Sequence, residues 1–96
     1  MATIEMSRAH ALSKVDARKK AEEIARGMES KLGIAWKWEG DTLKFDATSG
    51  PAKGTKGAIA VTDSNVRIDI DLPMMLRMMK GMIEQRVTDK LKEQFA

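Results

Sequence analysis

Hydrophobic and polar residues alternate along five segments of the chain, which is the pattern of strands with one buried face. These segments cover residues 3–7, 34–39, 42–47, 58–62 and 66–72. Gly40 and Asp41 separate the second segment from the third, and residues 63–65 separate the fourth from the fifth. Such short separations predict two β-hairpins. Because the other side of each segment is polar or charged, we expect an antiparallel sheet with one face in water.

Two helices are predicted, one between the first two strands and one at the end of the chain. Between Ser13 and Gly33 the apolar residues recur at spacings of three and four, which indicates one apolar helical face. Ser13 with Asp16 resembles a capping box, and Gly33 suits the left-handed residue that follows a helix. Pro73 suits the first turn of the second helix, and no later proline interrupts it before the chain ends.

The order strand, helix, four strands, helix predicts the α+β class. Both helices must cover the apolar face of the sheet, which gives a two-layer sandwich with a five-stranded antiparallel sheet and a long C-terminal helix. This arrangement is a reduced helix-grip-like fold. A chain of 96 residues forms one hydrophobic core, so residues 1–96 are expected to be a single domain.

The first half of the second predicted helix is more apolar than one docking face requires. Its apolar residues, spread over about half of the helix circumference, are Met74, Met75, Leu76, Met78, Met79, Met82 and Ile83. The second half carries only a narrow stripe, made of Ile83, Val87, Leu91 and Phe95. Two interpretations follow: the methionines belong to the core or to a homodimer seam, or they form an adaptable surface for another partner.

Composition narrows the classes of function. The 17 basic and 14 acidic residues give a net charge of +3 without a basic tail. Trp36 and Trp38 alternate with Lys37 and Glu39 and are expected to face the core, so the sheet lacks the outward aromatics of a nucleic-acid platform. Without cysteine there is no disulfide or thiolate metal site. No segment reaches the roughly 18 apolar residues of a membrane span, and no signal peptide is evident, so we expect a cytoplasmic protein.

Signals for catalysis are weak. His10 is the only histidine, and its place between the first strand and the first helix favours a capping or packing role. The segment 49–57, SGPAKGTKG, has the composition of a phosphate-binding loop, but its glycine and lysine spacing does not match a P-loop. It predicts a mobile connection between strands. We expect no catalytic residue, no metal and no cofactor.

Several local motifs together resemble a known family. They are His10-Ala11-Leu12, Ala17-Arg18, the segment Trp38 to Phe45 (WEGDTLKF), Gly57 with Ile59 and Val61, and a final helix with Leu76, Lys80, Ile83-Glu84 and Leu91. The chain resembles, over nearly its whole length, the polyhydroxyalkanoic acid system family, also called the polyhydroxyalkanoate granule region proteins. The resemblance implies a bacterial cytoplasmic protein of storage-polyester metabolism, and it carries over no catalytic residue. The basic loop and the methionines of the final helix depart from the family pattern.

We therefore expect a non-enzymatic accessory or binding protein of the storage-polyester system. Its contact surface would be formed by Met74, Met75, Met78, Met79 and Met82, and it would meet a granule, a granule-associated protein or a second copy of the chain. An alternative is a small helix-grip-like module that binds an acyl chain or another apolar ligand between the C-terminal helix and the sheet. That alternative requires a cavity lined by Trp36, Trp38, Phe45 and Met79.

Overall fold

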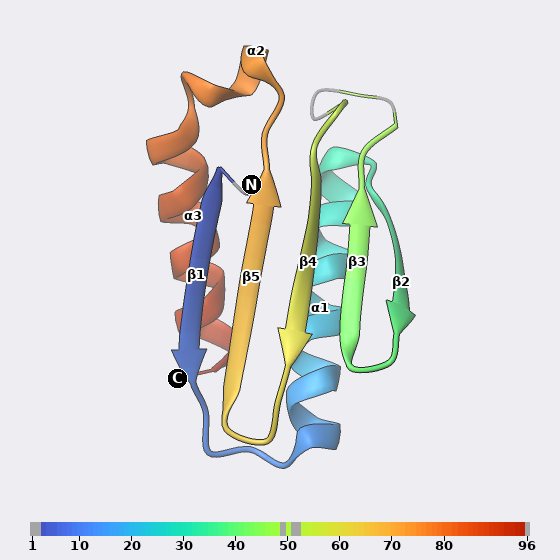
Figure 1. Ribbon diagram of the computed structural model, residues 1–96, viewed down its shortest axis with the longest axis vertical. Helices are drawn as coiled ribbons and strands as arrows, with labels where there is room; N and C mark the ends of the chain where they lie inside the picture. The colour runs from blue at the N-terminus through green and yellow to red at the C-terminus, as the bar shows by residue number, and fades with distance from the viewer. Residues whose placement is uncertain (1–2, 49, 51–52, 96) are drawn as a thin grey trace.

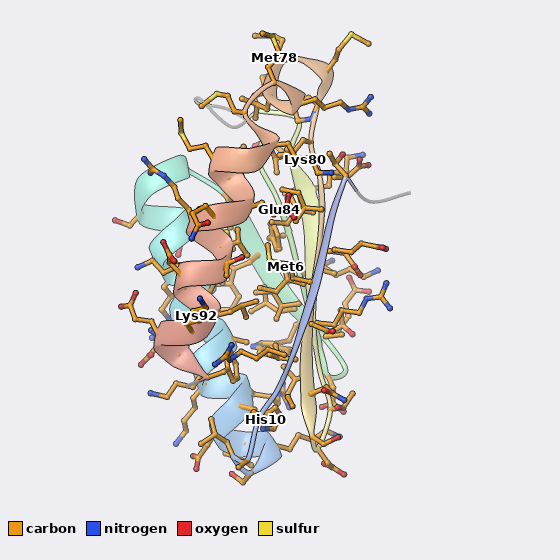
Figure 2. All side chains as sticks on the ribbon, turned by 90° about the vertical axis from the view of Figure 1, so that its left-hand side faces the viewer. Met6, His10, Met78, Lys80, Glu84 and Lys92 are labelled. Atoms are coloured by element: carbon orange, nitrogen blue, oxygen red, sulfur yellow. The ribbon has the colours of Figure 1, made fainter. Side chains whose placement is uncertain are left out.

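A computed structural model describes residues 3–48, 50 and 53–95, so Ser49, Pro51 and Ala52 of the predicted loop lie outside the described residues. The elements along the chain are β1 (Ile4–Ala9), α1 (Lys14–Leu32), β2 (Ala35–Glu39), β3 (Thr42–Asp46), β4 (Lys56–Val61), β5 (Asn65–Asp71), α2 (Met74–Arg77) and α3 (Lys80–Gln94). The strands form one antiparallel sheet in the order β1-β5-β4-β3-β2. Helices α1 and α3 lie on the same face of it (Figures 1 and 2). The predicted α+β sandwich is confirmed.

The strand register sorts side chains between the two faces of the sheet. One row crosses all five strands on the inner face and consists of Trp38, Leu43, Ile59, Ile68 and Met6. The adjacent row on the outer face consists of Lys37, Lys44, Ala58, Asp69 and Glu5. This alternation follows from the two-residue period of a strand, and it leaves the outer face charged, as Figure 2 shows.

The core lies between the inner face of the sheet and the two helices. Helix α1 covers β2, β3 and β4, whereas α3 covers β1 and contacts α1. Helix α1 packs through the buried residues Ala17, Ala21, Ile24 and Ala25; the small alanines let the helix backbone come close to the sheet. Helix α3 anchors through Leu91 and, just after its end, Phe95.

Both predicted ends of α1 are confirmed. The Oγ of Ser13 accepts a hydrogen bond from the backbone N–H of Asp16 at 3.1 Å, which satisfies one of the free amides of the first turn. Gly33 has φ 70°, and its N–H donates to the carbonyl oxygen of Glu29 at 3.0 Å. A residue with a side chain would be strained in this left-handed conformation.

The predicted loop at 49–57 ends two residues too late, because β4 begins at Lys56. Lys56 pairs in register with Asp46 on β3 and Asp71 on β5, and Gly57 lies opposite Phe45. Glycine is required at position 57 because a Cβ there would overlap the ring of Phe45 and the backbone oxygen of Asp69. Here glycine makes room for a neighbouring ring within a strand, so it does not mark a turn.

The prediction of one continuous C-terminal helix is wrong. Helix α2 ends at Arg77 and α3 begins at Lys80. At the junction the N–H of Met79 donates to the carbonyl oxygen of Leu76 at 3.0 Å, a tighter turn than that of an α-helix. The chain leaves β5 at the end of the sheet and must reverse direction there, so that α3 can run back over β1 (Figure 1). A straight helix from Pro73 would instead carry its apolar stripe away from the sheet.

Candidate functional site

The five methionines proposed as a contact surface lie together on α2, the turn after it and the first residues of α3. We call this group, Met74, Met75, Met78, Met79 and Met82, the methionine end. Helix α2 lies beyond the tip of the sheet (Figure 1), and Figure 2 shows Met78 at the extremity of the molecule. The position follows from the chain direction, since Pro73 starts α2 where β5 has already ended.

The methionine end is open to solvent. Met74, Met75 and Met78 are 80%, 87% and 94% exposed, and Met79 and Met82 are also exposed. Of their apolar neighbours, Leu76 and Ile83 are partly buried against the core. The interpretation that the methionines belong to the core of the chain is therefore wrong. Helical periodicity predicts an apolar arc that is too wide for one docking face. In the structure, the methionine side chains that widen this arc are exposed to solvent in the single chain.

The residues of the alternative ligand cavity do not come together. Trp36, Trp38 and Phe45 lie on strands covered by α1, whereas Met79 precedes α3, on the side of the sheet that carries β1. Trp36 and Trp38 are partly buried on the edge strand β2, so the expectation that they lie in the core holds only in part. Strands β5 and β4 lie between the aromatic strands β2 and β3 and the strand β1 that α3 covers, so the aromatic residues and Met79 lie at different places on the same face of the sheet.

Polar contacts fix both indole rings to α1. The Nε1 of Trp38 donates to Glu22 at 2.6 Å, and the Nε1 of Trp36 donates to Glu29 at 3.3 Å. The guanidinium of Arg18 lies 4.3 Å from the centre of the Trp38 ring, which is a cation–π distance. These contacts hold the edge strand β2 against α1. They explain the two tryptophans as structural residues, with no need for a ligand-binding role.

A shallow hollow of about 450 Å³ lies over β2, β3 and the start of β4. Its lining includes Lys37, Lys44 and Asp46, which belong to the outer face of the sheet. This hollow is open and charged, so it does not provide the apolar cavity that an acyl ligand requires.

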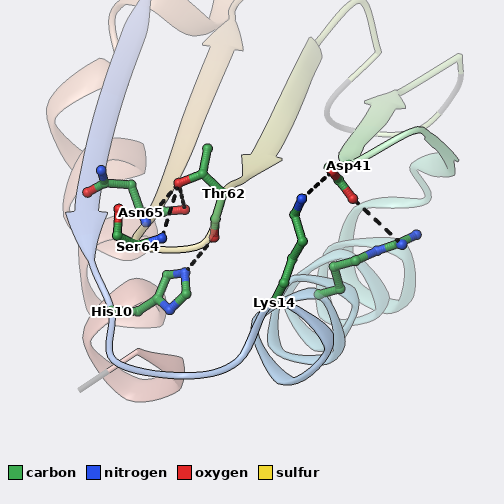
Figure 3. A network of polar contacts seen from close by, with 7 residues as sticks. His10, Lys14, Asp41, Thr62, Ser64 and Asn65 are labelled. Atoms are coloured by element: carbon green, nitrogen blue, oxygen red, sulfur yellow. Dashed lines mark hydrogen bonds and ion pairs between the residues drawn. The ribbon is translucent and has the colours of Figure 1, made fainter.

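His10 lies at the end of the molecule opposite to Met78 (Figure 2), where it has a structural role through the contacts drawn in Figure 3. Its Nδ1 accepts the backbone N–H of Leu12 at 3.2 Å, and its Nε2 lies 2.9 Å from the carbonyl oxygen of Thr62. These partners assign the proton to Nε2, which donates to Thr62. The ring also packs against Phe95, with 5.9 Å between ring centres. His10 thus joins the end of β1 to the β4–β5 turn and to the C-terminal segment.

Lys14 and Arg18 hold the β2–β3 turn against the start of α1. Lys14 Nζ lies 2.7 Å and Arg18 Nη1 3.8 Å from the carboxylate of Asp41 (Figure 3). The hydrogen bond between Lys14 and Asp41 raises the pKa of Lys14 and lowers the pKa of Asp41. On the outer face, Arg67 bonds to Asp69 and Glu5, which raises the pKa of Arg67. Each of these charges pairs with an opposite charge, as in a solvated structural network.

Sequence reasoning did not select the basic residues that accompany the methionines. Arg77 belongs to α2 and Lys80 begins α3. A usable signal was present, since residues 72–83 contain both of these basic residues and no Asp or Glu. In the residues that the structure describes, no helix has the length and apolar character needed to cross a bilayer.

These features define the class of protein: a small two-layer α+β domain with an exposed, methionine-rich apolar end. The chain belongs to the family of polyhydroxyalkanoic acid system proteins, whose family model matches residues 4–95. This match confirms the family predicted from the sequence motifs. The family description names the storage system and states no molecular activity. No curated protein and no solved structure matches the chain significantly.

Proposed function

We propose that the protein is a non-enzymatic accessory protein of the polyhydroxyalkanoate system and that it docks on storage granules in the cytoplasm through the methionine end. Family membership supports the link to the storage polyester. The observation that carries the proposal is the exposure of Met74, Met75 and Met78, each at least 80% open to solvent.

The exposed area is large enough to hold a small domain on an apolar surface. Full burial of a methionine side chain contributes about 1.5–3 kcal/mol. Transfer of Met74, Met75 and Met78 into an apolar phase would therefore contribute about 4.5–9 kcal/mol. The loss of translational and rotational freedom on binding reduces this value, so we expect reversible association.

The shape and chemistry of the methionine end favour a deformable surface over a rigid pocket. Met78, on the turn between α2 and α3, is at the extremity of the molecule (Figure 2). Methionine side chains are unbranched and polarizable, and they adapt to irregular apolar surroundings. An amorphous polyester surface offers such surroundings without demanding a fixed side-chain arrangement.

Co-sedimentation with protein-free polyester particles tests the proposal. We expect the wild type to sediment with the particles, and the variant Met74→Gln/Met75→Gln/Met78→Gln to remain in the supernatant. Glutamine keeps the side-chain length and helix propensity and removes the apolar character. The matched control is Val15→Gln, which replaces an exposed apolar side chain, 64% open to solvent, near the start of α1. This control should sediment like the wild type.

Thermal unfolding of the same proteins separates binding from folding. The triple methionine variant should unfold at the wild-type temperature, because the three side chains are exposed. Equal sedimentation of this variant and the wild type would refute the proposal. Wild-type binding to native granules but not to protein-free particles would assign the contact to another component of the granule surface, a protein or a lipid, instead of the polyester. A wild-type dimer that the triple variant converts to a monomer would identify a second copy as the occupant.

A further inference from the structure

Basic side chains accompany the methionine end. Three basic residues lie there: Arg77 in α2, Lys80 at the first position of α3, and Lys53 on the connection between β3 and β4. The whole chain has 17 basic and 14 acidic residues and a net charge of +3.

Lys53 is part of this end because its loop touches the start of α2. A Cβ at Gly54 would lie 3.2 Å from the Cβ of Pro73, so the loop backbone and the proline are neighbours. The sequence contains no acidic residue in 47–57 or 72–83, and Glu84 follows one turn after Lys80 in α3. The nearest acidic residues on the adjacent strands, Asp46 and Asp71, both pair in register with Lys56.

In the described part of the chain, ion pairs engage six other basic residues. Lys14 pairs with Asp41 at 2.7 Å and Arg67 pairs with Glu5 at 3.1 Å. Among the described residues, none of the ion pairs includes Lys53, Arg77 or Lys80. The Nε of Arg77 donates to the carbonyl oxygen of Leu72 at 3.2 Å, a contact that uses one of the five N–H donors of the guanidinium. The charge therefore remains at this surface.

We propose that the methionine end binds the surface of an anionic phospholipid layer. The methionines enter the outer part of the acyl chains, and Lys53, Arg77 and Lys80 contact the phosphates. The inference rests on the proposed function because it uses the same end of the molecule, and it adds that the granule is met through anionic lipid at its surface.

The interleaving of apolar and basic residues favours a lipid surface over an acidic protein. Met75, Leu76, Arg77, Met78, Met79 and Lys80 follow one another in a single short segment. Interfacial protein segments combine apolar side chains with lysine and arginine in this way. An acidic protein would need apolar side chains beside its carboxylates to cover the methionines, whereas a phospholipid layer presents phosphates and acyl chains together over its whole surface.

Electrostatic attraction sets the expected preference for anionic over neutral lipid. A lysine or arginine close to an anionic membrane surface strengthens binding by about fivefold at low salt. Three such residues should therefore give at least a tenfold preference for anionic over neutral lipid after screening. The preference should decrease as the salt concentration rises, whereas the apolar contribution of the methionines should not.

Vesicle flotation of the full chain is the test. The probes are phosphatidylcholine vesicles, vesicles with about one-third phosphatidylglycerol, and lipid-free polyester particles. The variant Lys53→Gln/Arg77→Gln/Lys80→Gln removes the charge at the methionine end. Its matched control, Lys19→Gln/Lys20→Gln/Lys92→Gln, removes the same charge from α1 and α3 and keeps the methionine end intact.

We expect the wild type and the control to prefer anionic vesicles at least tenfold, and the charge variant to lose this preference while still binding polyester. Equal binding to neutral and anionic vesicles, or equal losses in the two charge variants, would overturn the inference. Binding to polyester without binding to vesicles would overturn it and leave the proposed function standing. Failure to bind either surface, together with failure to bind native granules, would refute both. Retention on polyglutamate without vesicle flotation would assign the end to an acidic protein and also overturn the inference.

Discussion

Gly57 offers the sharpest test of the packing within the sheet. It lies in β4 between Phe45 of β3 and Ile70 of β5. A Cβ at this position would overlap the Cζ of Phe45 and the backbone oxygen of Asp69, and it would lie 2.9 Å from the Cε1 of Phe45. Phe45 is 5% exposed, so its ring cannot swing into solvent without leaving the core, and Asp69 can yield only by moving β5.

The expected cost of Gly57→Ala follows from this overlap. Insertion of a methyl group into a well-packed core costs about 1–3 kcal/mol, and the lower chain entropy of alanine returns about 0.5–1 kcal/mol. Because one of the clashing atoms belongs to the backbone, we expect a net destabilisation of about 2 kcal/mol. For a domain of this size, that corresponds to a decrease of about 8–16 °C in Tm.

Gly27→Ala is the matched control. Gly27 lies within α1, and a Cβ there would meet no atom within 4 Å. Alanine favours a helix over glycine by about 1 kcal/mol, so this variant should be more stable than the wild type. Urea unfolding followed by tryptophan fluorescence measures both changes. The double variant Phe45→Leu/Gly57→Ala should lose less than the sum of the single changes, since the smaller side chain leaves room for the methyl group.

Wild-type or higher stability of Gly57→Ala would refute this reasoning. In that case β4 would not approach β3 and β5 as closely as the structure shows. Strict additivity in the double variant would instead assign the whole effect to the backbone of β5 and none to the ring of Phe45.

Three further predictions concern the sheet and its turns. Trp38→Ala should cost about 2–4 kcal/mol, whereas Lys44→Ala on the outer face should cost less than about 0.5 kcal/mol; similar losses in urea unfolding would mean that the faces are misassigned. The lowered pKa of Asp41 means that its stabilising effect is complete above its ordinary pKa of 3.8 and is lost as the pH falls through the lower, folded-state value. The stability difference between the wild type and Asp41→Asn should therefore shrink below about pH 4, and an undiminished difference at pH 2 would contradict it. Hydroxyacyl chains should cause no saturable quenching of Trp36 and Trp38 fluorescence, because both rings are seated against α1; stoichiometric quenching would revive the ligand-binding alternative.

The elements of the sheet could be predicted because their physical signal is local. Alternation with a period of two assigns Leu43 to the inner face and Lys44 to the outer face without knowledge of the partner strands. Ser13 and Gly33 likewise mark the ends of α1 through contacts within a few residues. The pairing of β1 with β5 depends on contacts between distant parts of the chain, so no pattern within either strand specifies it.

The features that the sequence did not reveal depend on tertiary neighbours. The composition of residues 49–57 predicts a loop at Gly57. The true reason for glycine there is the ring of Phe45, which belongs to another strand and leaves no trace in the local sequence. The break at Met78 and Met79 was missed because apolar residues at helical spacing look the same whether a core covers them or water does. In the sequence, Arg77 and Lys80 look like two isolated charges on a long helix. The structure brings both to the methionine end, because the chain leaves the sheet after β5 and turns between α2 and α3.

Solvent exposure also gives the methionine end a distinct oxidation chemistry. Met6 and Met28 are partly buried against the core, whereas the thioethers of the methionine end are open to peroxide. Oxidation to the sulfoxide turns a flexible apolar side chain into a polar one, and reductases reverse the change. Mild peroxide should therefore modify this end first and leave the fold intact. If the methionine end holds the granule as proposed, oxidation of its thioethers would weaken that binding, and reduction of the sulfoxides would restore it.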